Sequence, residues 1–168
     1  MPSRLLDRLL RRPVPAKTFE LRPLEESRIN RRGLSAGGLA PSFELPDLDG
    51  VPRSLGEFRG RRVLLLFSAP DCVPCDGLAP DVVAMHERRG APAVLMVARG
   101  DASDNRAKAA QHDYRFPILL QPGWQVSKLY GRFATPVAYV VSESGVLETG
   151  ALVGADAIRR QLDAEAHR

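Results

Sequence analysis

Residues 63–75 read VLLLFSAPDCVPC, and this stretch decides how the rest of the chain is interpreted. The apolar run Val63–Phe67 predicts a strand buried on both faces, as in sheets that are covered by helices on both sides. Cys72 and Cys75 follow after a short turn, and apolar residues then recur at helical spacing. The stretch therefore predicts a central strand, a turn, and a helix that begins at a Cys-x-x-Cys pair.

The number of cysteines limits what the pair can form, because Cys72 and Cys75 are the only two in the chain. A disulfide-stapled secreted domain of this kind usually carries about four to eight cysteines, and a structural zinc site needs a complete tetrahedral ligand set. The three histidines share no local spacing with the pair that would complete such a set. We expect no metal and no other cofactor. A redox-active dithiol or a chance pair remains, and with two cysteines in 168 residues the short spacing favours the dithiol.

The predicted position of Cys72 favours its thiolate, which is the attacking species in thiol chemistry. Unpaired N–H groups and the helix dipole stabilise negative charge at a helix N-terminus. Such placement lowers a cysteine pKa from about 8.5 to roughly 3.5–7.5. Cys75 lies about one turn further on, close enough to attack a mixed disulfide on Cys72. We expect Cys72 to attack a disulfide and Cys75 to resolve the intermediate; a permanently reduced, buried pair or a fixed disulfide is the alternative.

Composition and charge indicate one globular domain with a basic extension. The chain has 168 residues, 44% of them hydrophobic and 26% charged, which is enough for a substantial core. Residues 1–34 hold nine Lys and Arg against four Asp and Glu, whereas residues 35–168 hold fifteen against sixteen. The body therefore lacks the basic surplus that nucleic-acid binding needs, and we expect no nucleic-acid partner.

The N-terminal extension predicts a short basic amphipathic helix within residues 1–12, followed by a linker rich in Pro and Gly. We place the arm and linker at residues 1–37 and the folded domain at residues 38–168. The helix either packs on the domain or docks to an acidic membrane surface or partner. Its charges leave no room for the apolar core of a secretory signal, so we expect a cytoplasmic protein. A periplasmic or membrane-associated location is the alternative if the true start lies upstream.

Beyond residue 75, strand and helix patterns alternate and predict a mixed sheet between helices. Before the central strand, a small hairpin or edge strand is expected at residues 43–45, followed by a turn at Asp49-Gly50. The other expected elements are strands at 93–98, 118–120, 137–141 and 146–149, the last two joined as a hairpin through 142–145, and helices at 103–113 with Ser103 or Asp104 as cap, 125–130 and 155–166.

Three motifs in this order resemble the thioredoxin superfamily, and within it the TlpA-type thiol–disulfide oxidoreductases, or redoxins, which include MauD-like proteins. The sequence CVPC at residues 72–75 is similar to the active-site motif, and Pro80 to the proline that kinks the active-site helix. Thr135-Pro136 before a strand is similar to the cis-proline loop. The resemblance covers about residues 38–168. It implies an α/β, thioredoxin-like fold with a central mixed β-sheet flanked by helices.

The resemblance also implies partners and substrate-binding residues. The partners would be a disulfide-containing protein substrate and a thiol electron donor. Thr135 and Pro136 would lie beside the dithiol and pair with a bound substrate chain, and Val73 and Pro74, between the cysteines, would contact it as well. Trp124 is either a groove-lining residue or, as we expect, a buried core aromatic.

This sequence departs from the family pattern around the dithiol. Asp71 stands where the family usually has Trp, and its carboxylate would cap the helix but oppose a thiolate at Cys72. Leu66 stands where thioredoxin carries a buried Asp that assists proton transfer. The nearest other acid is Asp76, which we expect to be a solvated helix residue.

Two other functions compete with the oxidoreductase. A thiol peroxidase of the peroxiredoxin type needs Thr three residues before its reactive cysteine and Pro four residues before that Thr, but for Cys72 these positions hold Ala69 and Leu65. A non-catalytic thioredoxin-like module would use the same groove, together with the basic arm, only to hold a partner.

Overall fold

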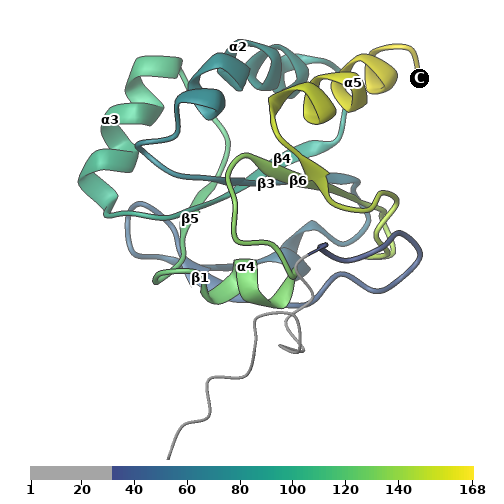
Figure 1. Ribbon diagram of the computed structural model, residues 1–168, viewed down its shortest axis with the longest axis horizontal. Helices are drawn as coiled ribbons and strands as arrows, with labels where there is room; N and C mark the ends of the chain where they lie inside the picture. Colours follow the sequence, from purple (N-terminus) through teal and green to yellow (C-terminus); the bar gives the residue numbers. More distant parts are fainter. Residues whose placement is uncertain (1–31) are drawn as a thin grey trace, which may run out of the picture.

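The computed structural model describes residues 32–168, so the predicted N-terminal helix and most of the linker lie outside the described residues. The elements follow one another in the alternating order that the sequence predicts (Figure 1). In chain order they are β1 (Glu44–Pro46), β2 (Pro52–Ser54), the 3-10 helix η1 (Leu55–Phe58), β3 (Val63–Ser68), α2 (Val73–Glu87), β4 (Ala93–Ala98), α3 (Ala102–His112), β5 (Ile118–Leu120), α4 (Gln125–Leu129), β6 (Val137–Val141), β7 (Leu152–Val153) and α5 (Ala155–Ala166).

The main sheet has five strands in the order β5-β4-β3-β6-β7. β3 runs parallel to β4 and antiparallel to β6, and β4 runs parallel to β5. β1 and β2 form a separate two-stranded hairpin. The mixed, thioredoxin-like α/β sheet that the sequence predicts is therefore confirmed, with the apolar run 63–67 at its centre.

Side chains of β3 alternate between two cores, one on each face of the sheet. Leu65 and Phe67 pack in one cluster with η1, α4 and the β1 hairpin, while Leu64 and Leu66 pack in the other with α2 and α5. Figure 1 shows the same layers, with α2 and α5 on one side of the sheet and α4 and β1 on the other. Because both faces are covered, each residue of β3 is buried, and a one-residue slip would exchange the two cores.

Two predicted element boundaries are wrong. The segment 146–149 forms only isolated bridges, and the strand that pairs with β6 on the side away from β3 is β7, Leu152–Val153. Helix α3 begins earlier than predicted, because the side chain of Asp101 accepts a hydrogen bond from the N–H of Asp104 and is the N-cap, in place of Ser103 or Asp104. An Asp at the cap satisfies an N–H that the helix itself leaves unpaired.

Described residues that precede β1 contact the folded domain. The N–H of Leu34 donates to the Tyr139 hydroxyl at 3.3 Å, and the N–H of Gly37 donates to the carbonyl of Leu147 at 2.8 Å. The Tyr130 hydroxyl donates to the carbonyl of Pro41 at 2.9 Å. These bonds hold the end of the predicted linker against the α4 side of the sheet; the boundary between residues 37 and 38 stays a prediction.

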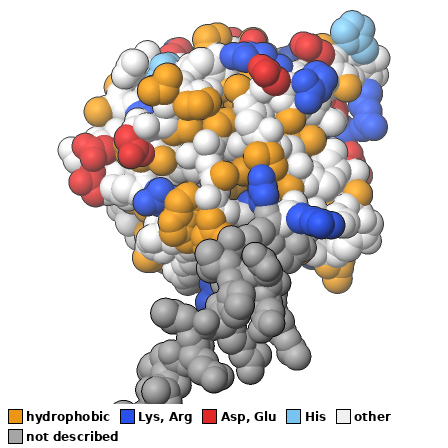
Figure 2. All heavy atoms as spheres, in the orientation of Figure 1, with side chains coloured by type: hydrophobic (Ala, Val, Ile, Leu, Met, Phe, Trp, Pro, Cys, Tyr) orange, Lys and Arg blue, Asp and Glu red, His pale blue; other side chains and the backbone are white. Residues whose placement is uncertain are grey.

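Charged side chains of both signs are interspersed with apolar ones on the face shown in Figure 2. Within residues 32–168, no helix combines the length and the apolar character that are needed to cross a bilayer.

Candidate active site

The two cysteines lie where β3 leads into α2. They form a disulfide, with their Cα atoms 5.2 Å apart. The pair lies at the start of α2, as the sequence predicts, but the N-cap is Cys72 and not Asp71, which directly precedes it. Pro74 lies in the first turn, where its missing N–H costs no hydrogen bond. Short-range sequence features therefore suffice to place both sulfurs at a helix N-terminus.

Backbone N–H groups of the first turn point toward Cys72. The N–H of Cys75 lies 3.2 Å from the Sγ of Cys72, and it also donates to the Cys72 carbonyl at 3.0 Å. An N–H that lies beside a sulfur stabilises negative charge on it, which favours the thiolate in the reduced protein. Cys72 and Cys75 expose only 6% and 5% of their surface, whereas Val73 between them exposes 78%. Val73 therefore leaves an exposed apolar side chain beside the buried disulfide.

Thr135 and Pro136 reach the same edge of the sheet from the neighbouring strand. Phe67 of β3 pairs with Val137 of β6, so the turn after β3 and the turn before β6 leave adjacent strands at one edge. The peptide bond between Thr135 and Pro136 is cis. Thr135 is half-buried and Pro136 is buried. The structure thus brings the two predicted substrate-binding segments to one edge, beside each other in the sheet order.

Trp124 also lies near this edge, but it is half-buried and not the core aromatic that we expected. The guanidinium carbon of Arg99, which follows the last residue of β4, lies 4.0 Å from the centroid of the Trp124 ring. Phe133 packs edge-on against the same ring, with centroids 5.8 Å apart, and its own side chain is exposed. Arg99, Trp124 and Phe133 form a stack that no sequence motif predicts, because its members come from three separate loops.

The expectation that Asp76 is a solvated helix residue is wrong, because its carboxylate is paired with side chains of another helix. Its Oδ1 accepts from the ammonium of Lys108 at 2.7 Å and lies 3.1 Å from the Nε2 of His112. The hydrogen bond from Lys108, with a smaller contribution from His112, holds the pKa of Asp76 below its usual value. Lys108 and His112 come from α3, so the residue that follows Cys75 is ion-paired to a different helix.

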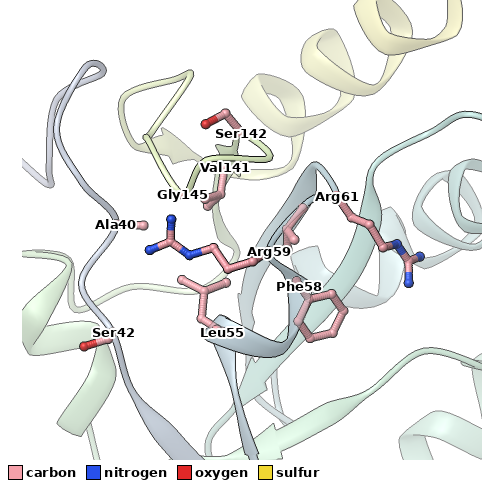
Figure 3. Close-up of a pocket in the computed structure, with 11 residues that line it drawn as sticks. Ala40, Ser42, Leu55, Phe58, Arg59, Arg61, Val141, Ser142 and Gly145 are labelled. Atoms are coloured by element: carbon pink, nitrogen blue, oxygen red, sulfur yellow. The ribbon is translucent and has the colours of Figure 1, made fainter.

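A pocket at the opposite end of the sheet is not part of this site. It is lined by Val63, the first residue of β3, and by Leu55, Phe58 and Gly145, and the side chain of Arg59 extends into it while that of Arg61 points away (Figure 3). The dithiol follows the last residue of β3, at the other end of the strand. Among residues 32–168, no group of three or more His, Cys, Asp or Glu side chains is arranged to hold a metal ion.

The sheet order, the cysteine pair at the N-terminus of α2 and the cis proline before β6 define the structural class of the protein as thioredoxin-like. The model of the AhpC/TSA family matches residues 36–149, which is more than half of the chain. The chain belongs to the AhpC/TSA family.

Individual relatives share this region. The chain is 28% identical over 115 residues to the thiol-disulfide oxidoreductase ResA of Bacillus thuringiensis subsp. konkukian, which covers 67% of this chain and 66% of ResA. It is 35% identical over 111 residues to the methylamine utilization protein MauD of Paracoccus denitrificans, covering 61% of this chain and 55% of MauD. It is 29% identical over 151 residues to the chloroplastic peroxiredoxin Q of Triticum aestivum, covering 80% of this chain and 69% of that protein. The chain thus spans less than two thirds of the length of ResA and MauD.

The fold is similar to a solved structure from Chlorobium tepidum, that of a protein assigned as the thiol:disulfide interchange protein DsbE. Its TM-score is 0.69 and its identity is 27%, over 80% of this chain and 96% of that chain. The resemblance to the thioredoxin-like redoxins and to MauD-like proteins that the sequence indicates is therefore confirmed.

Proposed function

We propose that this protein is a thiol–disulfide oxidoreductase that exchanges its own dithiol with a disulfide in a protein substrate. The observation that carries the proposal is the cysteine pair at the N-terminus of α2, where the Sγ of Cys72 faces a backbone N–H at 3.2 Å. Relatives named thiol-disulfide oxidoreductase support the same chemistry.

In the reduced protein, the Cys72 thiolate attacks one sulfur of the substrate disulfide. A mixed disulfide forms, and the other substrate sulfur leaves as a thiolate that takes up a proton. Cys75 then loses its proton and attacks the Sγ of Cys72, and the remaining substrate sulfur leaves as a second thiolate. Two electrons have moved from the protein to the substrate, and the Cys72–Cys75 disulfide present in the structure is the oxidised product. An external thiol donor restores the dithiol.

Thr135 and Pro136 would receive the substrate chain, and Val73 and Pro74 would pack against it. The support is their place at the same sheet edge as the dithiol, together with the high exposure of Val73. Cys72 is assigned as the attacking residue because it caps the helix, whereas Cys75 lies within the first turn.

The test compares the wild-type protein with Cys72→Ser and Cys75→Ser in the dithiothreitol-driven reduction of a test disulfide protein. We expect the wild type to accelerate reduction, Cys72→Ser to give the uncatalysed rate, and Cys75→Ser to accumulate a mixed disulfide with the substrate. A wild-type rate no higher than that of Cys72→Ser would refute the proposal and leave a thiol peroxidase or a non-catalytic binding module.

Thiol peroxidase activity is the second candidate, and the similarity to peroxiredoxin Q favours it. Ala69 and Leu65 oppose it, because the peroxidase pattern needs Thr and Pro at these positions relative to Cys72. Thiol-dependent consumption of a hydroperoxide, lost in Cys72→Ser, is the result that would favour this candidate over disulfide exchange.

A further inference from the structure

The buried ammonium group of Lys108 hydrogen-bonds to the turn that precedes Cys72. Lys108 lies in the middle of α3 and exposes only 6% of its side chain. Its Nζ donates to the carbonyl of Ala69 at 2.8 Å, and the same carbonyl accepts from the N–H of Cys72 at 3.3 Å. Lys108 and Cys72 are therefore joined through one carbonyl oxygen. A lysine is rarely buried to this extent unless its ammonium is paired, so a partner for the charge is expected close by.

The partner of this ammonium is Asp76, the residue that follows Cys75. The Lys108 Nζ and Asp76 Oδ1 atoms are 2.7 Å apart, and Asp76 also contacts the His112 ring, which stacks on Tyr114. One cation and one anion are thus held next to the dithiol, the cation from α3 and the anion from α2. Neither contacts a sulfur atom directly, so any influence on the cysteines acts through space or through the turn.

Other charged groups face the same region from each element around it. Asp71 precedes Cys72 in the turn, and Asp104 lies on α3, one turn before Lys108. Both carboxylates line an open hollow together with Lys108 and Asp76. His112 faces Asp76 from the end of α3. Lys108 is the one lysine or arginine that lines this otherwise acidic hollow in the described chain.

We propose that Lys108 and Asp76 are an opposed pair of positioning residues that sets the thiolate stability of Cys72, and with it the redox equilibrium of the dithiol. The proposal rests on the proposed function, since it concerns the same cysteines. The Lys108 cation favours the thiolate and the Asp76 carboxylate disfavours it, so their balance tunes the thiol pKa. This pair supplies charge control in a site where β3, the strand that leads to the dithiol, carries no acidic or basic side chain.

A purely structural tether makes a different prediction. Removing either partner breaks the same ion pair, so a tether predicts that both single variants disturb the turn in the same direction. Charge control predicts opposite directions. Lys108→Met leaves the Asp76 carboxylate beside the dithiol with His112 as its remaining partner, whereas Asp76→Asn leaves the ammonium without its carboxylate.

The experiment measures the Cys72 pKa from the ultraviolet absorbance of the thiolate, and the equilibrium of each purified variant with glutathione. We expect Lys108→Met to raise the Cys72 pKa by roughly 0.5–1 pH unit and Asp76→Asn to lower it by a similar amount, less than a charge in direct contact would produce. A lower thiol pKa stabilises the reduced form, so Asp76→Asn should become more oxidising and Lys108→Met more reducing, each by roughly threefold or more in the equilibrium constant. The double variant should return toward the wild type.

Two further variants separate charge from folding. Lys108→Gln keeps a donor toward the Ala69 carbonyl but removes the charge, and it should shift the pKa in the direction of Lys108→Met. Asp104→Asn removes a carboxylate of the same hollow that has no hydrogen bond or ion pair with Lys108, and its effect should be smaller than that of Asp76→Asn.

Shifts of the same sign in Lys108→Met and Asp76→Asn, or a wild-type pKa in Lys108→Gln, would overturn the proposal. Both measurements follow the protein's own dithiol and need no substrate. They therefore remain decisive even if the wild type fails to reduce the test disulfide protein, which would overturn only the proposed function.

Discussion

Cys72 combines two roles in one residue, because it caps α2 and supplies a sulfur of the disulfide. Ser, Thr, Asp and Asn are the usual caps, since their oxygen atoms accept an N–H of the first turn. Here the Sγ of Cys72 takes that place opposite the N–H of Cys75 at 3.2 Å. Reduction leaves the same N–H facing a thiolate, which is a better acceptor than a disulfide sulfur. The cap is therefore stronger in the reduced protein than in the oxidised one.

Asp71 provides a test of electrostatics at the residue scale. Its side chain is exposed and directly precedes Cys72, so its carboxylate opposes the thiolate through solvent-screened repulsion. We expect Asp71→Asn to lower the Cys72 pKa by a few tenths of a pH unit. This pKa shift should be smaller at high salt, because salt screens the repulsion between exposed charges. Titration of the thiolate absorbance at two salt concentrations measures both. An unchanged or raised pKa would contradict the expectation.

The sequence predicts the cysteine pair because its signals are local: a fixed spacing, a strand before and a helix after. The cis proline at Thr135-Pro136 is expected only from the resemblance to the thioredoxin superfamily. It does not predict the role of Lys108, which lies 39 residues from Ala69. Nothing in the composition of α3 distinguishes Lys108 from an exposed lysine, and only the packing of α3 beside the turn after β3 buries it. Asp76 is misread as solvated for the same reason, since its partners belong to another helix.

At the scale of the element, α3 differs from the other long helices in what it buries. Its buried residues are Asn105 and Lys108, both polar. The Asn105 side chain donates to the carbonyls of Arg99 and Asp101, at 2.8 Å each. Polar bonds to the preceding loop and to the turn after β3, more than a wide apolar stripe, therefore fix this helix. A helix without a clear apolar period is one whose orientation a sequence pattern cannot give.

Removing the cap of α3 tests this description. Asp101→Ala loses the bond from the Asp104 N–H, which is 2.8 Å long, and should reduce the free energy of unfolding by about 1 kcal/mol. Urea unfolding of the wild type and the variant measures the difference. Ser103→Ala, which alters a helix residue that does not act as the cap, is the matched control and should stay within about 0.5 kcal/mol of the wild type. Equal losses in the two variants would show that the cap is misassigned.

The incorrect hairpin prediction has an element-scale cause as well. The segment 146–149 carries an alternating apolar pattern, but it pairs only through single bridges to Leu39 and Val141. On the side of β6 away from β3, the pairing strand is instead β7, which follows a few residues later. Local alternation indicates that a segment can form a strand, but it does not say which strand pairs with β6. The segment that pairs is β7, which lies directly before α5 and packs against it.

At the scale of the whole molecule, an ionic clamp joins the start of the central strand to the end of the last helix. Arg62 precedes β3, and its guanidinium contacts Glu165 of α5 at 2.7 Å and Glu148 at 2.9 Å. The Glu165 side chain is 2% exposed. The hydrogen bond from Arg62 lowers the pKa of Glu165, and the same interaction lowers the pKa of Glu148.

The clamp predicts an acid-dependent loss of stability. Because the pKa of Glu165 is lower in the folded protein than in the unfolded chain, its contribution is complete above the ordinary value of 4.5 and is lost as the pH falls through the folded pKa. We expect Glu165→Gln to reduce the free energy of unfolding at neutral pH by about 1–3 kcal/mol, below the value for a fully buried pair because Arg62 keeps Glu148.

Denaturant unfolding of the wild type and Glu165→Gln across the acidic range measures this dependence. The difference between the two should shrink as the pH falls below the ordinary glutamate pKa. Asp81→Asn, which breaks the exposed ion pair with Arg159, is the control and should cost about 0–1 kcal/mol. A gap between the wild type and Glu165→Gln that stays constant with pH would contradict the assignment.

Trp124 is the single tryptophan of the chain, and it lies at the edge of the sheet that carries the dithiol. Its ring contacts Arg99, which follows β4, and Phe133, which precedes the Thr135-Pro136 turn. The molecule thus contains one indole, which can be excited at wavelengths where its three tyrosines do not absorb, and it lies beside the loop that we propose to receive a substrate chain. Selective excitation of that indole can follow partner association in unlabelled protein, without a dye that would itself consume the thiols.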